Sequence, residues 1–335
     1  MLWFFIPAAL GVAHASPHTH HVRPAAAAAS HRPMHASVVR SKHSARVEAP
    51  PGTSIKSLGK DRYLLRDDTR GYVLDLSAPG RMRVEIVLKR PRKNMATADE
   101  RYVAMARLNR ERRWVLVSSD ELHHLSILRV DQSVQSADEQ RVLLPRALQF
   151  LAGVLRDLPK PLQGRAAHSG HKALSAQGSS VRLPQEGTAR IAPVRDRMRA
   201  LLAAEGTTSE LDKDGDLVFQ APSGLRAFVA LDSESPEFLR VATQLPHDGD
   251  VVQQRAACND TNLSVPLCKC IPLDDKTTSL NAEQLSVATS DLRGLKASAL
   301  AALQTCRAGY EAGLKAGPSA APVRAAPRHR RAAPR

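Results

Sequence analysis

Four cysteines are the residues whose type and spacing point most directly to chemistry. They are Cys258, Cys268, Cys270 and Cys306, all in the C-terminal half of the chain. Cysteines bind zinc, carry out redox exchange or form disulfides. The Cys-x-Cys spacing, with no histidine nearby, does not fit the usual zinc patterns, and redox catalysis would need Cys-x-x-Cys at a helix start. The sequence therefore predicts disulfides, which an oxidising compartment permits.

The predicted elements restrict how these cysteines pair. Cys268 and Cys270 lie two residues apart on a predicted strand, about 6.8 Å from each other on one face, so a bond between them would be strained. Cys258 and Cys306 lie on predicted helices. We expect each helical cysteine to bond to one member of the strand pair, and the spacing leaves open which member.

A histidine-rich segment near the N-terminus is the other candidate for metal chemistry. It contains His18, His20, His21, His31, His35 and His43. Imidazole nitrogens bind Zn²⁺, Cu²⁺ and Ni²⁺. After cleavage before Ser16, an amino-terminal copper site would need an amide proton at the second residue, and Pro17 has none. Weak metal binding by an envelope protein is therefore an alternative function, and we predict no cofactor.

Enzyme signatures are missing from the sequence. Asp212–Asp216 has the carboxylate density of a calcium loop, but Leu217 and Ser223 stand where an EF-hand needs glycine and glutamate, so a tight turn at Gly215 is expected. No Gly-x-Ser-x-Gly elbow, phosphate-binding glycine loop or dinucleotide fingerprint is present. We predict a non-enzymatic protein. The rival hypothesis is an enzyme of unknown reaction with its site between two domains.

The first fifteen residues indicate export. They form a short apolar run that closes on Ala13-His14-Ala15, the small-x-small pattern of a signal peptidase site. The run is too short to span a bilayer as a mature helix. We expect cleavage between Ala15 and Ser16 and a periplasmic or secreted bacterial protein, with an uncleaved anchor as the alternative.

Basic charge is concentrated outside the predicted domains. The chain has a net charge of +15, of which residues 16–52 contribute +4 and residues 316–335 contribute +5. Both tails lack apolar periodicity and are predicted to be disordered. They favour attraction to an anionic envelope surface. A further basic run offers an interaction surface at Lys89, Arg90, Arg92 and Lys93. An aromatic content of 4% argues against specific nucleic-acid binding.

The chain also repeats itself. The pattern of Leu58–Leu65 recurs at Leu211–Val218, a helix ending at Asn109 matches one ending at Asn259, and the offset stays between about 150 and 153 residues. These matches predict a tandem duplication, with domains at 53–160 and 191–315 joined by a flexible linker at 161–190.

Periodicity and turn residues predict the same elements in both copies. In the second copy they are helices at 191–206, 250–262 and 291–314 and strands at 211–220, 225–231, 238–245, 265–273 and 279–287. In the first copy they are strands at 54–66, 71–76, 82–88, 114–118 and 122–130 and helices at 97–110 and 137–158, without the opening helix. The predicted fold class is α+β, with helices packed on an antiparallel sheet in each of two tandem domains.

The second copy resembles the bacterial YbjN-like domain. The resemblance covers about 194–312 and rests on Asp214–Phe219, Ala230–Asp232 with Ser235–Leu239, and Ala257–Asn262 leading to Lys269. The first copy matches in layout, with Asn109 aligned to Asn259, Arg112 to Asn262 and Arg62 to Gly215. The resemblance implies a fold like that of type III secretion chaperones, protein–protein binding and no catalytic residues.

Charge also predicts how the copies associate. Residues 51–160 carry +7 and residues 194–315 carry −4. Opposite charge favours docking of one copy on the other, and the linker keeps both at high effective concentration. We expect a monomer with a pseudo-dimeric pairing of domains, the basic run or the helix at 97–110 lying near the contact. The predicted function is binding of another protein or an envelope surface, in a chaperone-like or adaptor role.

Overall fold

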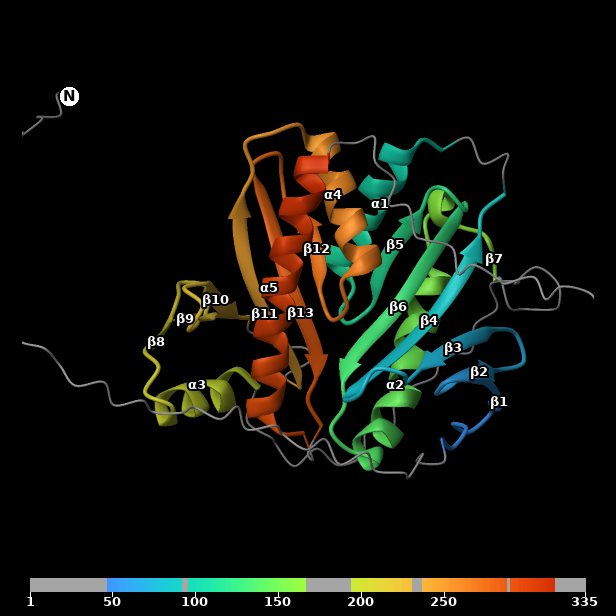
Figure 1. The fold of residues 1–335 in the computed structure, drawn as a ribbon, viewed down its shortest axis with the longest axis horizontal. Coiled ribbons are helices and arrows are strands. Elements are labelled where there is room, and N and C mark those ends of the chain that lie inside the picture. The colour runs from blue at the N-terminus through green and yellow to red at the C-terminus, as the bar shows by residue number, and fades with distance from the viewer. Residues whose placement is uncertain (1–46, 92–95, 167–193, 231–236, 288–289, 317–335) are drawn as a thin grey trace, which may run out of the picture. The chain divides into compact units, whose positions relative to one another are not determined.

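A computed structural model describes residues 47–91, 96–166, 194–230, 237–287 and 290–316 (Figure 1). These residues form two repeats, each with an antiparallel sheet and helices, as an α+β tandem repeat requires. The part of the chain from Ala45 onward is one compact unit. Several predicted features lie outside the described residues. They are the signal peptide with its cleavage site between Ala15 and Ser16, the histidine-rich segment and residues 317–335.

The first repeat runs from β1 to β7. Its elements are β1 (Ser54–Gly59), β2 (Arg62–Arg66), β3 (Gly71–Asp75), β4 (Arg81–Lys89), α1 (Ala98–Glu111), β5 (Leu116–Asp120), β6 (Leu125–Ser133), α2 (Ala137–Arg156), the 3₁₀ helix η1 (Lys160–Leu162) and β7 (Arg165–Ala166). Residues 47–53, which precede β1, contain no helix. The predicted linker begins too early, because η1 and β7 are ordered and β7 pairs with β4.

The second repeat contains an additional opening helix. Its elements are α3 (Val194–Ala204), β8 (Ser209–Leu211), β9 (Leu217–Gln220), β10 (Arg226–Val229), β11 (Phe238–Pro246), α4 (Val251–Ser264), β12 (Lys269–Pro272), β13 (Thr277–Leu285) and α5 (Leu292–Ala316). Gly206 ends the opening helix with a φ of +71°, the left-handed conformation that glycine adopts without cost.

The two sheets have the same strand order. The first is β1-β2-β3-β4-β6-β5, and the second, read from β8, is β8-β9-β10-β11-β13-β12. The long central strands also pair in the same register, since Arg83 faces Asp131 and Arg240 faces Glu283 at equivalent positions. Identical order and register confirm the duplication.

Two strands predicted as continuous are hairpins. The chain turns between β1 and β2 at Lys60 and Asp61, with φ values of 51° and 58°, and between β8 and β9 at Gly215, with a φ of +80°. Asp212 Oδ1 accepts hydrogen bonds from the amides of Asp214 and Asp216 at 3.0 and 2.9 Å. This is the tight turn expected for the acidic run, and it gives each repeat four strands before its middle helix instead of three.

Each repeat has its own apolar core. In the first, alternate residues of β4 (Met82, Val84, Ile86, Leu88) pack with α2, which lies behind the sheet in Figure 1. In the second, α3, α4 and α5 cover one face, and all four cysteines belong to this core. Phe238 and Leu285 of the second sheet instead join the core of the first repeat. The two repeats are therefore packed together by apolar as well as polar side chains.

Candidate functional site: the contact between the repeats

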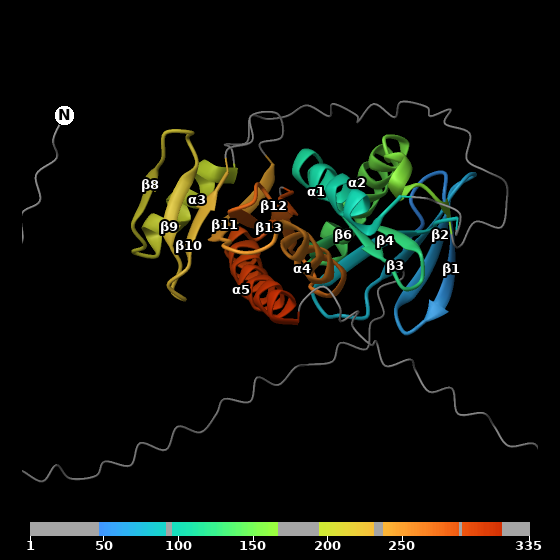
Figure 2. The same cartoon turned by 90° about the horizontal axis from the view of Figure 1, so that it is seen from above.

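The contact between the repeats has approximate two-fold symmetry. Helices α1 and α4 lie side by side (Figure 2). Helix α4 also packs on β5 of the first repeat, and α1 packs on β12 of the second. These are equivalent elements exchanged between the repeats, as in a dimer of identical domains. The helix at 97–110, predicted to lie near the contact, is α1.

Two carboxylates mark equivalent positions of this contact. Glu283 Oε2 accepts the amide hydrogen of Trp114 at 2.7 Å, and Asp131 Oδ2 accepts that of Leu267 at 3.4 Å. Trp114 and Leu267 both follow the middle helix of their repeat and both have positive φ, 61° and 58°. Positive φ is rare for bulky residues and persists only where the surroundings hold it. Each repeat thus fixes a strained turn of the other.

Basic side chains neutralise both carboxylates. Asp131 pairs with Arg83 Nε at 2.8 Å and with Arg129 Nε at 2.8 Å, and Glu283 pairs with Lys269 Nζ at 2.5 Å. Burial lowers the pKa of Lys269, and Glu283 opposes that shift. Lys269 and Glu283 are 4% and 5% exposed at their side chains, so neither charge is solvated. Removing one partner would leave the other charge buried alone.

The same basic residues satisfy the carbonyl groups that end the middle helices. Arg129 Nη1 donates to the carbonyl of Leu263 at 3.1 Å and Nη2 to that of Val265 at 2.5 Å. In the opposite direction, Lys269 Nζ donates to the carbonyl of Arg112 at 2.8 Å. The last carbonyls of a helix have no partner within it and carry partial negative charge. Each repeat therefore caps the middle helix of the other.

Acid should weaken this contact through Asp131. Burial alone would raise the pKa of Asp131, but Arg129 and Arg83 outweigh it and hold that pKa below the ordinary value of 3.8. A carboxyl whose folded pKa is depressed stabilises the fold fully above about pH 4 and loses this contribution as the pH falls through the folded pKa. Urea unfolding measured from about pH 7 to about pH 3 should show the loss, and Asp131→Asn should flatten it. An equally steep loss in Asp131→Asn would contradict the assignment.

A buried asparagine provides another link between the repeats. Asn259 on α4 accepts the amide hydrogen of Ser119 at 2.9 Å and donates to the carbonyl of Ser119 at 2.9 Å. These two bonds satisfy both backbone polar groups of Ser119, which lies on the edge strand β5. Asn109 and Asn262 make the same pair of bonds within their own repeats, to Val117 and Cys270.

These bonds correct the alignment of the two copies. Asn109 is equivalent to Asn262 and not to Asn259, and Arg112 does not occupy the position of Asn262. The sheet register likewise places Asp216, and not Gly215, at the position equivalent to Arg62. The predicted alignment pairs Asn109 with the first of the two asparagines of α4, an offset of 150, whereas α1 and α4 differ by 153. Asn259 has Ala106 at its equivalent position, so its role in the contact exists on one side only.

Asn259→Ala should destabilise the protein by about 2 kcal/mol, because two buried backbone groups of Ser119 lose their partners. Hydrogen exchange should show a less protected Ser119 amide. Asn109→Ala is the matched control, since it removes the same pair of bonds within the first repeat and should expose the amide of Val117 instead. Unchanged protection at Ser119 in Asn259→Ala would contradict the proposed link.

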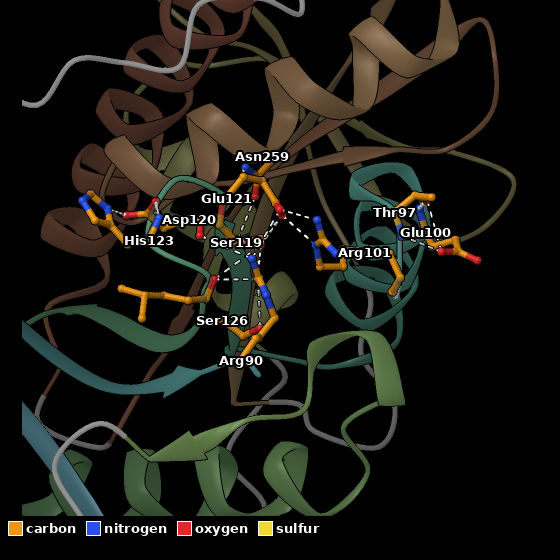
Figure 3. Close-up of polar contacts among 12 residues, drawn as sticks. Arg90, Thr97, Glu100, Arg101, Ser119, Asp120, Glu121, His123, Ser126 and Asn259 are labelled. Carbon is orange, nitrogen blue, oxygen red and sulfur yellow. Dashed lines mark hydrogen bonds and ion pairs between the residues drawn. The ribbon is translucent and has the colours of Figure 1, made fainter. Parts of the chain in front are cut away.

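The predicted basic interaction surface is wrong at Arg90. Arg90 is 4% exposed, and its Nη1 donates to the carbonyl of Leu125 at 2.7 Å and to Ser126 Oγ at 3.3 Å (Figure 3). It also contacts Ser119 Oγ and pairs with Glu121 at 3.3 Å. Arg90 is buried because these oxygens at the end of the β5–β6 hairpin take up its donors. Lys89 is exposed as predicted, and Arg92 and Lys93 lie outside the described residues.

The hairpin end in Figure 3 is a second polar cluster near the contact. Arg101 on α1 pairs with Glu121 through both nitrogens, Nε to Oε1 at 2.9 Å and Nη2 to Oε2. Burial would raise the pKa of Glu121, but hydrogen bonds from Arg101 and Ser119 and the charge of Arg90 lower it. Because Ser119 also binds Asn259, the cluster fixes the loop that the second repeat contacts.

One disulfide joins a helix to β12 and the other joins a helix to the residue just before β12. Cys258 on α4 bonds to Cys270, and Cys306 on α5 bonds to Cys268, which lies just before β12. The predicted pairing of helical with strand cysteines is confirmed, and the structure resolves the choice that the spacing left open. The bonds tie α4 and α5 to the edge strand that α1 of the first repeat contacts.

Metal and cofactor predictions are not tested by the described residues. Within them, no group of three histidine, cysteine, aspartate or glutamate side chains is placed to hold a metal ion. A scan against models of protein families and a search of curated proteins found no match to this chain. The resemblance to the YbjN-like domain therefore stays a prediction.

Proposed function

We propose that this protein is an exported, non-enzymatic binding protein with a chaperone-like or adaptor role. The observation that supports this most is the use of ionisable side chains between the repeats. An enzyme with a site there would need groups free to reach a substrate. Instead Asp131, Arg129, Lys269 and Glu283 are buried and hydrogen-bonded to the backbone of the other repeat. They hold two domains together and leave the outer surface for partners.

The disulfides support export. All four cysteines of the chain are bonded in pairs, which is typical of proteins that function in oxidising compartments. Within the described residues, no helix is long and apolar enough to cross a membrane. We propose a periplasmic or secreted protein that is monomeric, since the contact expected between two chains is made within one.

Exposed leucines are the best positions from which to detect a protein partner. Leu122 is 67% exposed at the tip of the β5–β6 hairpin, and Leu58 is 48% exposed on the edge strand β1. Apolar side chains presented on ordered elements commonly anchor protein interfaces.

Photoreactive amino acids at Leu122 and Leu58 in the exporting cell should each yield a discrete adduct with one envelope protein. A photoreactive residue at Lys213, exposed in the β8–β9 turn, is the control. The same faint mixture of adducts from all three positions would contradict the proposed role.

A further inference from the structure

One face of the first sheet is strongly basic. Residues of β4 alternate, so that Met82, Val84, Ile86 and Leu88 point to the core and the intervening residues point to the opposite face. The pairing register extends this opposite face to β1, because Lys56 faces Leu64, Leu64 faces Val73 and Val73 faces Glu85. Residues directly paired across strands share a face.

Six basic side chains occupy this face. We define the basic sheet face as Lys56, Arg62, Arg66, Arg81, Arg83 and Lys89. Only two acidic side chains, Asp75 and Glu85, lie among them on β3 and β4. Asp75 pairs with Arg62 at 3.6 Å. Lys56, Arg62, Arg66 and Lys89 are exposed, whereas the apolar residues between them, Leu64 and Val73, are buried.

The fold does not require this charge. The register of the second sheet gives the equivalent positions, which hold Glu210, Asp216, Gln220, Phe238, Arg240 and Pro246. One of six is basic there, and two are acidic. The second sheet has the same strand order and register without these basic residues. The basic side chains of the first repeat are therefore not needed to form the sheet. Only one of the six positions is an arginine in both sheets, as Arg83 and Arg240. Arg83 is also the residue that pairs with Asp131, a carboxylate of the contact between the repeats.

The charge pattern fits an extended anionic surface better than a protein. The face spans four strands, about 15 Å across at the usual strand spacing, so it presents a two-dimensional array of charges instead of a pocket for one anion. Protein interfaces need apolar or aromatic anchors at their centre, and the apolar residues at the middle of this face, Leu64 and Val73, are buried. Attraction to phospholipid head groups needs only positive charge.

The sequence leading into the face has the same sign. Arg40, Lys42 and Arg46 come before β1 in the sequence, and residues 16–52 carry +4 in total. Basic residues elsewhere in the same chain would add their attraction to the same surface.

We propose that the basic sheet face binds an anionic phospholipid membrane surface. This inference rests on the proposed export of the protein, which would place it beside such a surface. The sheet face adds a fixed array to the diffuse attraction of the tails, and it orients the first repeat toward the membrane.

Flotation of the full mature chain with vesicles tests this proposal. The vesicles contain phosphatidylcholine with about one third phosphatidylglycerol, and pure phosphatidylcholine vesicles are the reference. We expect binding to the anionic vesicles only. The triple variant Lys56→Glu, Arg66→Gln, Lys89→Gln should bind at least about tenfold more weakly, because each basic residue near an anionic membrane strengthens binding about fivefold.

A charge-matched variant separates the face from net charge. Arg107→Gln, Arg156→Gln and Lys160→Glu change the net charge equally at exposed positions on helices outside the face. This variant should retain most of the binding. Equal loss in both triple variants, or no loss in the face variant, would overturn the proposal, as would absence of binding by the unaltered chain.

The single variant Lys56→Glu guards against misfolding, because glutamate occupies the equivalent position of the second sheet. It should keep the unfolding midpoint of the unaltered chain and bind at least about fivefold more weakly, since it removes one basic residue from the face. Unaltered binding by this variant would count against the proposal. The unaltered chain could fail to bind vesicles and still give a discrete protein adduct from Leu122. That result would exclude the membrane as a partner and leave the proposed protein-binding role intact.

Discussion

Replacing all four cysteines by alanine is expected to lower the free energy of unfolding by about 4–8 kcal/mol, since each disulfide typically contributes about 2–4 kcal/mol. Domains of this size are stable by only about 5–15 kcal/mol, so the loss would be a large fraction of the total stability. The effect should be large because both bonds lie in the core formed by α3, α4, α5 and the second sheet. Urea unfolding measured by circular dichroism would give the value.

The two bonds should also differ from each other. Cys268 and Cys306 are 38 residues apart in the sequence, and Cys258 and Cys270 are 12 apart. A longer closed loop restricts the unfolded chain more, which makes the Cys268–Cys306 bond more stabilising by about 1 kcal/mol. Paired alanine variants of each bond measure the difference. Free thiols at all four positions in non-reducing mass spectrometry would refute the pairing itself.

Glu283→Ala is expected to destabilise the protein by about 3–5 kcal/mol, because it leaves the charge of Lys269 buried without a partner. The Lys269 side chain is 4% exposed, so water does not replace the carboxylate. The amide of Trp114 loses its acceptor in the same variant. The free energy of unfolding from urea titration provides the measurement.

A double variant distinguishes loss of the ion pair from loss of packing. Glu283→Leu with Lys269→Met removes both charges and keeps apolar volume, and it should recover much of the stability lost in Glu283→Ala. If the double variant has a lower free energy of unfolding than Glu283→Ala, the second substitution has added its own loss of stability. The two residues would then not act as a pair.

The sequence was most informative about the elements and their order. Alternation in β4, the capping residues of α1 and the apolar stripe of α5 are local signals that act within one element. The predicted bounds of these three elements, 82–88, 97–110 and 291–314, agree with the structure within a few residues. Thr97, for example, caps α1 by accepting the amide of Glu100 at 3.2 Å, and the Glu100 side chain accepts the amide of Thr97 at 2.6 Å. The resemblance between the copies extended these signals to the duplication.

Turns and the contact between repeats could not be read in the same way. Lys60 and Asp61 adopt positive φ without a glycine at either position, so the first hairpin was taken as one strand. Asn259 and Glu283 are unremarkable polar residues until the other repeat is placed beside them, because their partners lie 140 and 169 residues away. The basic run Lys89–Lys93 predicts an interaction surface that includes Arg90, and only the folded hairpin supplies the oxygens that bury this side chain.

An engineered disulfide across the contact is the most direct measurement of the pairing of the two repeats. The hydroxyl groups of Ser133 on β6 and Ser298 on α5 are in hydrogen-bond contact, one from each repeat. In the double variant Ser133→Cys, Ser298→Cys, the two thiols should form a bond within one chain, seen as a linked peptide pair from a protein of monomer mass. Each single variant is a control that should retain one free thiol. Two free thiols in the double variant, or bonds only between chains, would contradict the pairing of the repeats.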